Sequence, residues 1–202
     1  MSTGAILLAG GRARRLDGVA KPLLEVGGRS LLARAIAAVA DSDPLTIVGD
    51  AAAGYDRHRW VREEPAFAGP AAAVVAGLRS WPRDPEWTYV LACDLPAAAE
   101  ATRRLRAARD LVPHDTDGLC LADVSSRPQW LTGLYRTAPL RRAAEAMADD
   151  GRDAAVRDLF AGAAIAVIPA PADETDDVDT WDDLNRARAR YGDAVADDEE
   201  EE

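Results

Sequence analysis

Short apolar runs alternate along this chain with longer segments of helical periodicity, and this alternation limits the fold more than any other feature of the sequence. Runs of this kind are typical of strands buried on both faces of a parallel sheet. We expect strands at residues 5–8, 45–48, 60–61, 87–93, 118–122, 130–135 and 165–168. We expect helices at residues 30–40, 70–78, 98–111, 139–147, 154–160 and 181–191. The pattern predicts an α/β fold, a three-layer, doubly wound, Rossmann-like arrangement in which a mainly parallel sheet carries helices on both faces.

The charge distribution separates a short tail from the rest of the chain. The net charge is −11, and residues 193–202 hold seven acidic and no basic side chains, so residues 1–192 carry −4. We expect residues 1–192 to form a single domain and residues 193–202 to be a solvated, disordered acidic tail. Because neither part has a basic excess to offset phosphate repulsion, the composition argues against a nucleic-acid partner.

The cysteines and the N-terminus indicate the compartment. Cys93 and Cys120 are far apart in sequence and belong to no CxxC or Cys/His cluster, so we expect buried thiols instead of a disulfide framework or a zinc site. The apolar run Ala5–Ala9 is too short for a signal peptide or a membrane span. A cytoplasmic protein without a membrane partner is therefore expected.

Lys21 is the only lysine among the 24 basic residues of the chain. The other 23 basic residues are all arginine, so the composition of the chain strongly favours arginine, and yet position 21 is lysine. An ammonium group is a compact point charge on a flexible stem, which a planar guanidinium replaces poorly. We infer that position 21 requires an ammonium group; the alternative is the chance survival of a surface lysine.

The segment from Leu8 to Lys21, LAGGRARRLDGVAK, begins as a strand and turns at once through Gly10 and Gly11. Because glycine lacks Cβ, backbone N–H groups in such a turn can approach a bound anion closely. The same loop carries three cationic side chains that could reach the outer phosphates of a ligand, namely Arg12, Arg14 and Arg15. The segment matches neither a Walker P-loop nor the GxGxxG of dinucleotide folds. It predicts a phosphate cradle, with an exposed turn of solvated arginines as the alternative.

Asp94 follows the strongly apolar run YVLAC, so the sheet would place its carboxylate at the carboxyl end of a strand. Open α/β sheets bind ligands at that edge, and carboxylate oxygens suit a hard cation such as Mg²⁺ on substrate phosphates. Asp94 could equally cap the helix expected after Pro96. Spacing alone does not separate these two interpretations.

The segment DETDDVDT, residues 173–180, places five carboxylates within one expected loop. Asp179 or Thr180 would be a normal N-cap for the helix that begins near Trp181, but a cap requires only one of them. A nearby divalent cation would balance the remaining negative charge. We therefore interpret Asp177 and Asp179 as further candidate contacts to a metal ion.

These features together resemble the MobA-like NTP transferases, specifically the molybdenum cofactor guanylyltransferase family, over nearly all of residues 4–191. The matching segments, in order, are LAGGRARRLDGVAKPLLEVGG (8–28), GPAAAVVAGL (69–78), ACDLP (92–96), YRTAPLRRA (135–143), GRDAAVRDLF (151–160) and DVDTWDDL (177–184). The resemblance implies a nucleotidyltransferase domain with the sheet of the nucleotide-diphospho-sugar transferase type. It also implies that GMP is transferred from GTP to the terminal phosphate of molybdopterin, with Mg²⁺ bound and pyrophosphate released.

The resemblance also implies roles for particular residues. Nucleotide contacts would come from the backbone of Leu8, Ala9, Gly10 and Gly11, and pyrophosphate contacts from Arg12 and Arg15. Lys21 would contact the phosphates as a catalytic group, and Asp94 would hold Mg²⁺ with support from Asp179. An acidic residue before the GP motif, Glu63 or Glu64, would lie at the nucleotide, and the spacing does not decide which. Transient contacts with proteins that make or accept the cofactor would fit the same role.

The chain departs from the family pattern at two loop positions. The family usually has glycine where Asp17 stands and aspartate where Ala20 stands, directly before the lysine. Two alternatives therefore accompany the guanylyltransferase hypothesis. One is a cytidylyltransferase or another NTP transferase with a different phosphorylated acceptor. The other is a catalytically impaired, nucleotide-binding homologue.

Overall fold

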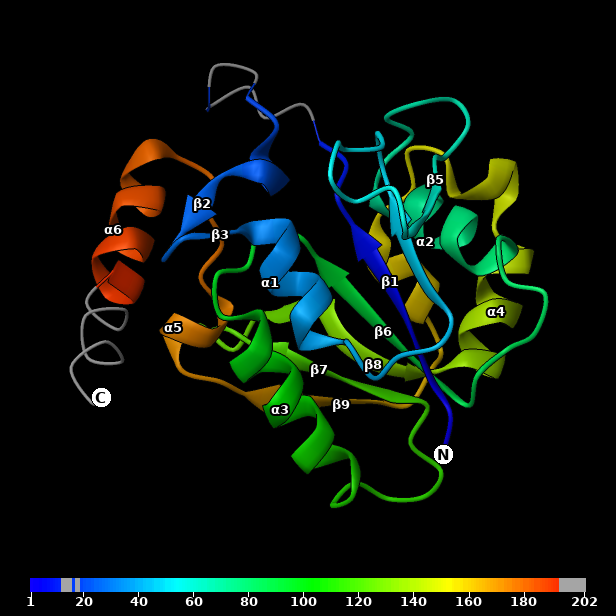
Figure 1. Ribbon diagram of the computed structural model, residues 1–202. Helices are drawn as coiled ribbons and strands as arrows, with labels where there is room; N and C mark the ends of the chain where they lie inside the picture. The colour runs from blue at the N-terminus through cyan, green and yellow to red at the C-terminus, as the bar shows by residue number, and fades with distance from the viewer. Residues whose placement is uncertain (12–15, 17–18, 193–202) are drawn as a thin grey trace.

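A seven-stranded sheet forms the centre of the computed structural model, which describes residues 1–11, 16 and 19–192 (Figure 1). In spatial order its strands are β5 (Arg59–Val61), β4 (Leu45–Val48), β1 (Thr3–Leu8), β6 (Trp87–Ala92), β8 (Pro128–Arg136), β7 (Gly118–Ala122) and β9 (Ile165–Pro169). Strand β8 runs antiparallel to both neighbours, and the other described pairings are parallel. The predicted α/β fold with a mainly parallel sheet is confirmed.

Five of the six described α-helices lie where the apolar periodicity predicts them, and the short α5 was not expected. They are α1 (Leu31–Ala38), α2 (Pro70–Arg79), α3 (Ala98–Arg109), α4 (Thr137–Ala146), α5 (Ala172–Thr175) and α6 (Trp181–Gly192). Helix α1 begins at Leu31 because the Ser30 hydroxyl accepts a hydrogen bond from the Ala33 N–H at 3.0 Å, as expected of an N-cap. In the described part of the chain, no helix is both long enough and apolar enough to cross a membrane.

Alternate residues of β1 face opposite layers of helices, which gives the predicted three-layer arrangement (Figure 1). Ala5 and Leu7 pack in one buried cluster with residues of α1 and α3, and Ile6 belongs to a second cluster with residues of α2 and α4. Helix α2 approaches the sheet closely, because a Cβ at Gly77 would lie 2.7 Å from the Ile6 side chain. Small residues on α2 therefore set the distance between this helix and β1.

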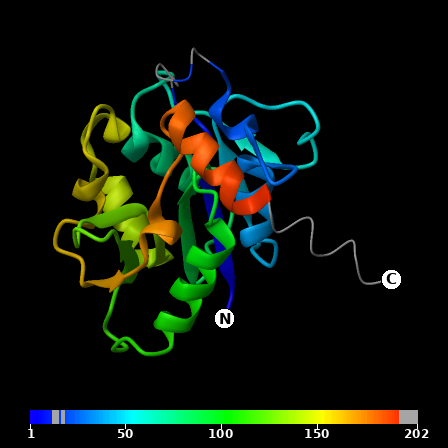
Figure 2. The ribbon, with the colours of Figure 1, turned by 90° about the vertical axis from the view of Figure 1, so that its left-hand side faces the viewer.

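A small hairpin and α6 extend the fold beyond the three layers. The hairpin consists of β2 (Glu25–Val26) and β3 (Arg29–Ser30), and it follows a 3₁₀ turn, η2 (Lys21–Leu23). Figure 2 shows α6 lying across this hairpin. A third buried cluster joins them through Val26, Val178 and Leu184. The packing fixes the segment before α6 relative to the loop that follows β1.

Two expectations about local structure were wrong or incomplete. The expected helix at 154–160 is instead a 3₁₀ turn, η4 (Val156–Phe160), which follows another, η3 (Ala148–Gly151). Ala155 and Ala161, which flank η4, are both in an extended conformation, so the turn is limited to five residues. Strand β8 begins at Pro128, two residues before the expected start at 130, and its register is irregular opposite Cys120 and Leu121.

Candidate active site

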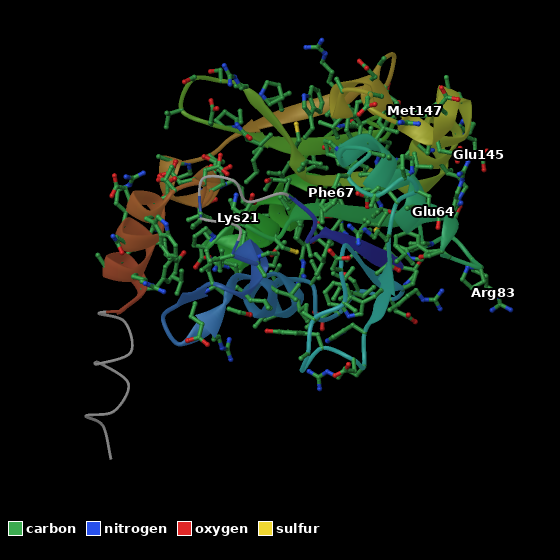
Figure 3. The ribbon with its side chains drawn as sticks, turned by 90° about the horizontal axis from the view of Figure 1, so that it is seen from above. Lys21, Glu64, Phe67, Arg83, Glu145 and Met147 are labelled. Atoms are coloured by element: carbon green, nitrogen blue, oxygen red, sulfur yellow. The ribbon has the colours of Figure 1, made fainter. Side chains whose placement is uncertain are left out.

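The loops that follow β1, β4, β5 and β6 meet at one edge of the sheet, because these four strands are parallel. They bring Ala9 and Gly10 beside Gly49 and place Asp94 just after the end of β6. Figure 3 looks onto the molecule from this side and shows Lys21 and Phe67 near the middle of it. The ligand-binding edge predicted for an open α/β sheet therefore gathers the predicted loop glycines, lysine and aspartate.

The glycine turn after β1 is open on one side and closely packed on the other. A Cβ at Gly49 would lie 3.0 Å from the Gly10 nitrogen and 3.1 Å from the Ala9 carbonyl carbon, so the loop after β4 must have glycine at this position. A Cβ at Gly10 would meet only the Val48 carbonyl oxygen, at 3.9 Å, and one at Gly11 would meet nothing within 4 Å. The two glycine backbones can therefore be approached by a ligand, as the sequence predicts for a phosphate cradle.

A cavity of about 400 Å³ adjoins this turn. It is lined by the loop after β1, the η2 turn with Leu32, and the loops after β4 and β5. A smaller cavity of about 30 Å³ continues from it toward Asp94 and is also lined by Leu8 and Cys93. Both cavities share Gly10 and Lys21 among their lining residues. A ligand that fills the larger cavity would thus reach the carboxylate at the end of β6.

Lys21 lies between two of the predicted carboxylates. Its Nζ donates hydrogen bonds to Asp94 Oδ2 at 2.7 Å and to Asp179 Oδ1 at 2.6 Å, and its side chain is 16% exposed. Burial alone would lower the pKa of Lys21, but the negative charges and hydrogen bonds of the two aspartates outweigh it and raise that pKa. The ammonium group is therefore firmly protonated at neutral pH.

Asp94 does not cap a helix. The residue before α3 is Ala97, and no side chain caps that helix, so the alternative interpretation of Asp94 was wrong. The Asp94 carbonyl instead accepts a hydrogen bond from the Val178 N–H at 3.0 Å. Because Val178 is buried, this bond ties the acidic segment before α6 to the end of β6.

Asp177 joins Asp94 and Asp179 in one cluster, in which one oxygen of each carboxylate lies within 4.8 Å of the others. Partial burial, followed by the charges of Asp94 and Asp179, raises the pKa of Asp177. One lysine thus faces three carboxylates, and an additional cation would relieve the repulsion among them. Carboxylate oxygens are hard ligands that suit Mg²⁺, so the donor set fits the expected ion.

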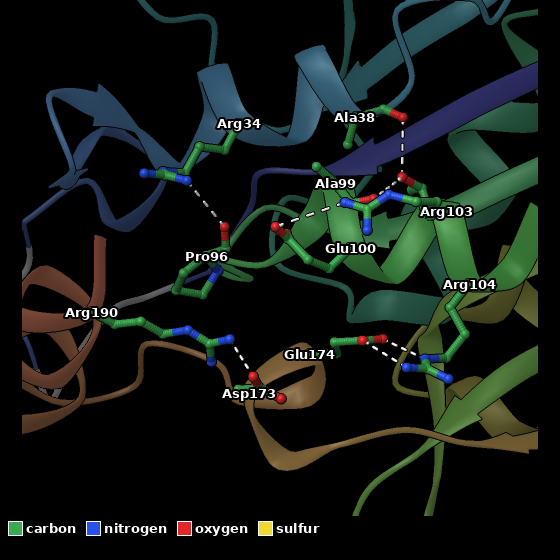
Figure 4. A network of polar contacts seen from close by, with 11 residues as sticks. Arg34, Ala38, Pro96, Ala99, Glu100, Arg103, Arg104, Asp173, Glu174 and Arg190 are labelled. Atoms are coloured by element: carbon green, nitrogen blue, oxygen red, sulfur yellow. Dashed lines mark hydrogen bonds and ion pairs between the residues drawn. The ribbon is translucent and has the colours of Figure 1, made fainter. Parts of the chain in front are cut away.

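The other acidic side chains of the 173–180 segment have separate partners. Figure 4 shows Asp173 paired with Arg190. It also shows Glu174 accepting two hydrogen bonds from Arg104, one from Nε and one from Nη2 at 2.7 Å. Asp173 and Glu174 lie on α5, so part of the expected loop is helical. The segment therefore contains structural ion pairs as well as candidate metal ligands.

Thr180, and not Asp179, caps α6. The Thr180 hydroxyl accepts a hydrogen bond from the Asp183 N–H at 3.2 Å, while Asp183 Oδ2 accepts from the Thr180 N–H at 2.7 Å. This reciprocal pair is a capping box. It leaves the Asp179 carboxylate available to Lys21.

The structure separates Glu63 from Glu64. Glu63 is 9% exposed, lines the large cavity, and accepts a hydrogen bond from the Phe67 N–H at 2.9 Å through Oε1. Glu64 is exposed, and Figure 3 shows it displaced outward from Phe67 and Lys21. Of these two glutamates, Glu63 is therefore the one placed at the cavity.

Several predicted residues lie elsewhere or outside the described part of the chain. Arg12, Arg15 and Asp17 fall outside the described residues, as does the acidic tail. Cys93 and Cys120 are buried free thiols, as expected, and burial raises the pKa of both.

Sequence reasoning missed most of the residues that line the large cavity, among them Asp50, Arg62 and Phe67. Asp50 could have been found, because it follows the strand at 45–48 just as Asp94 follows β6. Arg62 likewise follows β5, whereas Phe67 lies in a loop with no recognisable signal.

The sequence of the chain is similar to those of known nucleotidyltransferases. Residues 5–165 match the model of the MobA-like NTP transferase domain. The chain is 40% identical over 118 residues to the molybdenum cofactor guanylyltransferase of Rhodopseudomonas palustris, a match that covers 54% of this chain and 56% of that protein. A protein of Synechococcus elongatus named "probable molybdenum cofactor guanylyltransferase" is 35% identical over 154 residues, which covers 68% of this chain and 74% of that one.

Solved structures share the fold. Molybdopterin-guanine dinucleotide biosynthesis protein A from Archaeoglobus fulgidus superposes with a TM-score of 0.68 at 17% identity, covering 94% of this chain and 99% of that one. The 4-diphosphocytidyl-2C-methyl-D-erythritol synthase of Anaerococcus prevotii gives a TM-score of 0.62 at 15% identity, with 95% and 98% coverage. These similarities confirm the predicted sheet type. The chain belongs to the MobA-like NTP transferase family of nucleotidyltransferases.

Proposed function

We propose that this chain is a Mg²⁺-dependent guanylyltransferase that transfers GMP from GTP to the terminal phosphate of molybdopterin and releases pyrophosphate. One observation carries the proposal. The Lys21 ammonium lies between Asp94 and Asp179, where the open glycine turn, the large cavity and a cluster of three carboxylates meet. This combination suits the binding of a triphosphate together with a divalent cation.

In the proposed reaction, a phosphate oxygen of the acceptor attacks the α-phosphorus of GTP, the bond to the β-phosphate oxygen breaks, and pyrophosphate leaves. No protein nucleophile is required, so the residues act by alignment and by electrostatic stabilisation. The backbone at Gly10 and Gly11 would hold the triphosphate, and Lys21 would stabilise charge on the phosphoryl oxygens and the leaving group. Asp94, Asp177 and Asp179 would hold Mg²⁺, which when bound neutralises charge on the phosphates.

The choice of GTP and of molybdopterin rests on the relatives. The sequence relatives at 35–40% identity are named as molybdenum cofactor guanylyltransferases. A similar fold in the Thermus thermophilus protein named 2-C-methyl-D-erythritol 4-phosphate cytidylyltransferase motivates the second candidate, transfer of CMP or another nucleotide to a different phosphorylated acceptor. In either role the protein would act in the cytoplasm and contact the proteins that make or accept the cofactor only transiently.

Purified protein assayed with Mg²⁺, molybdopterin and each of the four NTPs distinguishes these functions. We expect acceptor-dependent release of pyrophosphate with GTP and little release with CTP, ATP or UTP. A preference for CTP would contradict the guanylyl assignment. Release with GTP that does not depend on molybdopterin would contradict the assignment of the acceptor.

A catalytically impaired homologue remains a distinct hypothesis because Ala20 replaces the usual aspartate before the lysine. Ala20 is exposed and stands at the N-cap of η2, which has no side-chain hydrogen bond, while Lys21 is held by Asp94 and Asp179. The lysine is thus oriented without a carboxylate at position 20, which supports an active enzyme. Under the impaired hypothesis, Ala20→Asp would create activity that the parent protein lacks; turnover by the parent protein would eliminate that hypothesis.

A further inference from the structure

The large cavity has two chemically different ends. Gly10, Gly11 and Lys21 also line the smaller cavity that leads to Asp94, and they mark one end. The loops after β4 and β5 contribute residues that line the large cavity but not the smaller one, including Asp50, Arg62, Glu63 and Phe67, and we call this part the base end. If the triphosphate binds at Lys21, as the proposed function requires, the nucleobase extends into this part of the large cavity. The inference below rests on that function for the orientation of the ligand.

Phe67 is an exposed aromatic side chain at the base end of the cavity. It is 44% exposed, whereas Trp81, Trp87, Tyr89 and Tyr135 are all buried in the core. Its backbone has a φ of 64°, a left-handed conformation that is unfavourable for a residue other than glycine. The Glu63 carboxylate accepts a hydrogen bond from the Phe67 N–H at 2.9 Å, which stabilises this conformation. The loop therefore accepts backbone strain while presenting an apolar ring to the cavity.

Arg62 supports the ring and is itself anchored. Its guanidinium carbon lies 4.9 Å from the centre of the Phe67 ring, within the range of a cation–π contact. The same guanidinium pairs with Asp50, which comes from the loop after β4. Residues from two loops, the one after β4 and the one after β5, thus hold one aromatic ring at the cavity. Such an arrangement presents a flat surface of low conformational freedom to a ligand.

We propose that Phe67, braced by Arg62, is the stacking platform for the nucleobase of the bound nucleotide. Aromatic rings and guanidinium planes stack on nucleobases, and because every base has a π-face, this contact does not depend on which base is bound. The platform supplies nucleotide affinity and positions the base. It assigns to Phe67 a binding role that is separate from the phosphate contacts of Lys21.

Equilibrium binding of GTP and of inorganic triphosphate, without acceptor, tests the platform. The variants are Phe67→Tyr, which keeps the ring, and Phe67→Leu, which keeps an apolar side chain at the same left-handed position. We expect the wild type and Phe67→Tyr to bind GTP alike. We expect Phe67→Leu to bind GTP about ten- to a hundred-fold more weakly, the range expected for loss of one base–aromatic stack. Inorganic triphosphate should bind all three proteins equally, since it has no base.

Two outcomes would overturn the platform. Equal GTP affinity of Phe67→Leu and Phe67→Tyr would show that the ring does not stack on the base. An equal loss of GTP and triphosphate affinity in Phe67→Leu would show that the ring acts only by shaping the cavity. A failure of the proposed function would give a different result. If the three proteins show the expected differences in GTP affinity but the wild type transfers no nucleotide, the platform is supported and the transfer reaction is refuted.

Discussion

Replacing Lys21 by glutamine removes the one described cation that lies between two carboxylates of the candidate metal site. Lys21 is 16% exposed, Asp94 25% and Asp179 48%, with N–O distances of 2.7 and 2.6 Å. Removing one partner of a fully buried ion pair costs about 3–5 kcal/mol, and exposed pairs contribute about 1 kcal/mol or less. For this partly exposed group we expect Lys21→Gln to lower the free energy of unfolding by about 1–3 kcal/mol. In a chain of this length the melting temperature would fall by roughly 3–10 °C.

Thermal unfolding with and without Mg²⁺ measures this effect and its origin. Because the ammonium and the metal ion are attracted to the same carboxylates, Mg²⁺ should stabilise Lys21→Gln more than it stabilises the wild type. Arg190→Gln is a matched control, since Arg190 pairs with Asp173 on the half-exposed side of the same segment. It should cost less than about 1 kcal/mol and leave the response to Mg²⁺ unchanged. An unchanged melting temperature in Lys21→Gln, or identical Mg²⁺ responses in variant and wild type, would refute the reasoning.

Three further predictions concern the elements that hold the site. Gly49→Ala places a Cβ about 3.0 Å from a backbone nitrogen of the glycine turn, so nucleotide affinity measured by titration should fall at least ten-fold; unchanged affinity would mean that the turn moves freely. Thr180→Ala removes the capping box with Asp183 and should lower stability by about 1 kcal/mol in a denaturant titration, whereas no loss would show that α6 begins without it. The hydrogen bond from Arg104 lowers the pKa of Glu174, so the charged form stabilises the fold above the ordinary pKa of 4.5. The stability advantage of the wild type over Glu174→Gln should therefore shrink as the pH falls below about 4.5 and through the lowered pKa; a constant difference would contradict the pair.

The strand and helix positions could be predicted because burial on both faces leaves a continuous apolar run, and amphipathic helices leave a 3.6-residue period. Lys21 and Asp94 could also be predicted, because a lone lysine in a glycine-rich loop and an aspartate directly after a buried strand can be recognised in the sequence alone. The structure then places them in contact although they are 73 positions apart in the sequence.

Other features depend on tertiary contacts that leave no local pattern. Glu63 differs from Glu64 in being buried and in accepting a hydrogen bond from the Phe67 N–H, and neither property can be seen in the sequence. The 173–180 segment looked like one acidic loop, but Arg104 from α3 and Arg190 from α6 remove two of its carboxylates from the site. The short η4 turn was mistaken for a helix because apolar spacing over so few residues does not distinguish the two.

The dependence of turnover on Mg²⁺ in Asp94→Asn tests the central claim most directly. Asparagine keeps the shape of the side chain and one oxygen but removes the charge that faces Lys21 and the candidate metal ion. We expect pyrophosphate release from GTP and molybdopterin to fall by about a hundred- to a thousand-fold at every Mg²⁺ concentration, with the circular dichroism spectrum of the folded protein unchanged. Wild-type turnover by Asp94→Asn at saturating Mg²⁺ would contradict the assignment of this site as the catalytic centre.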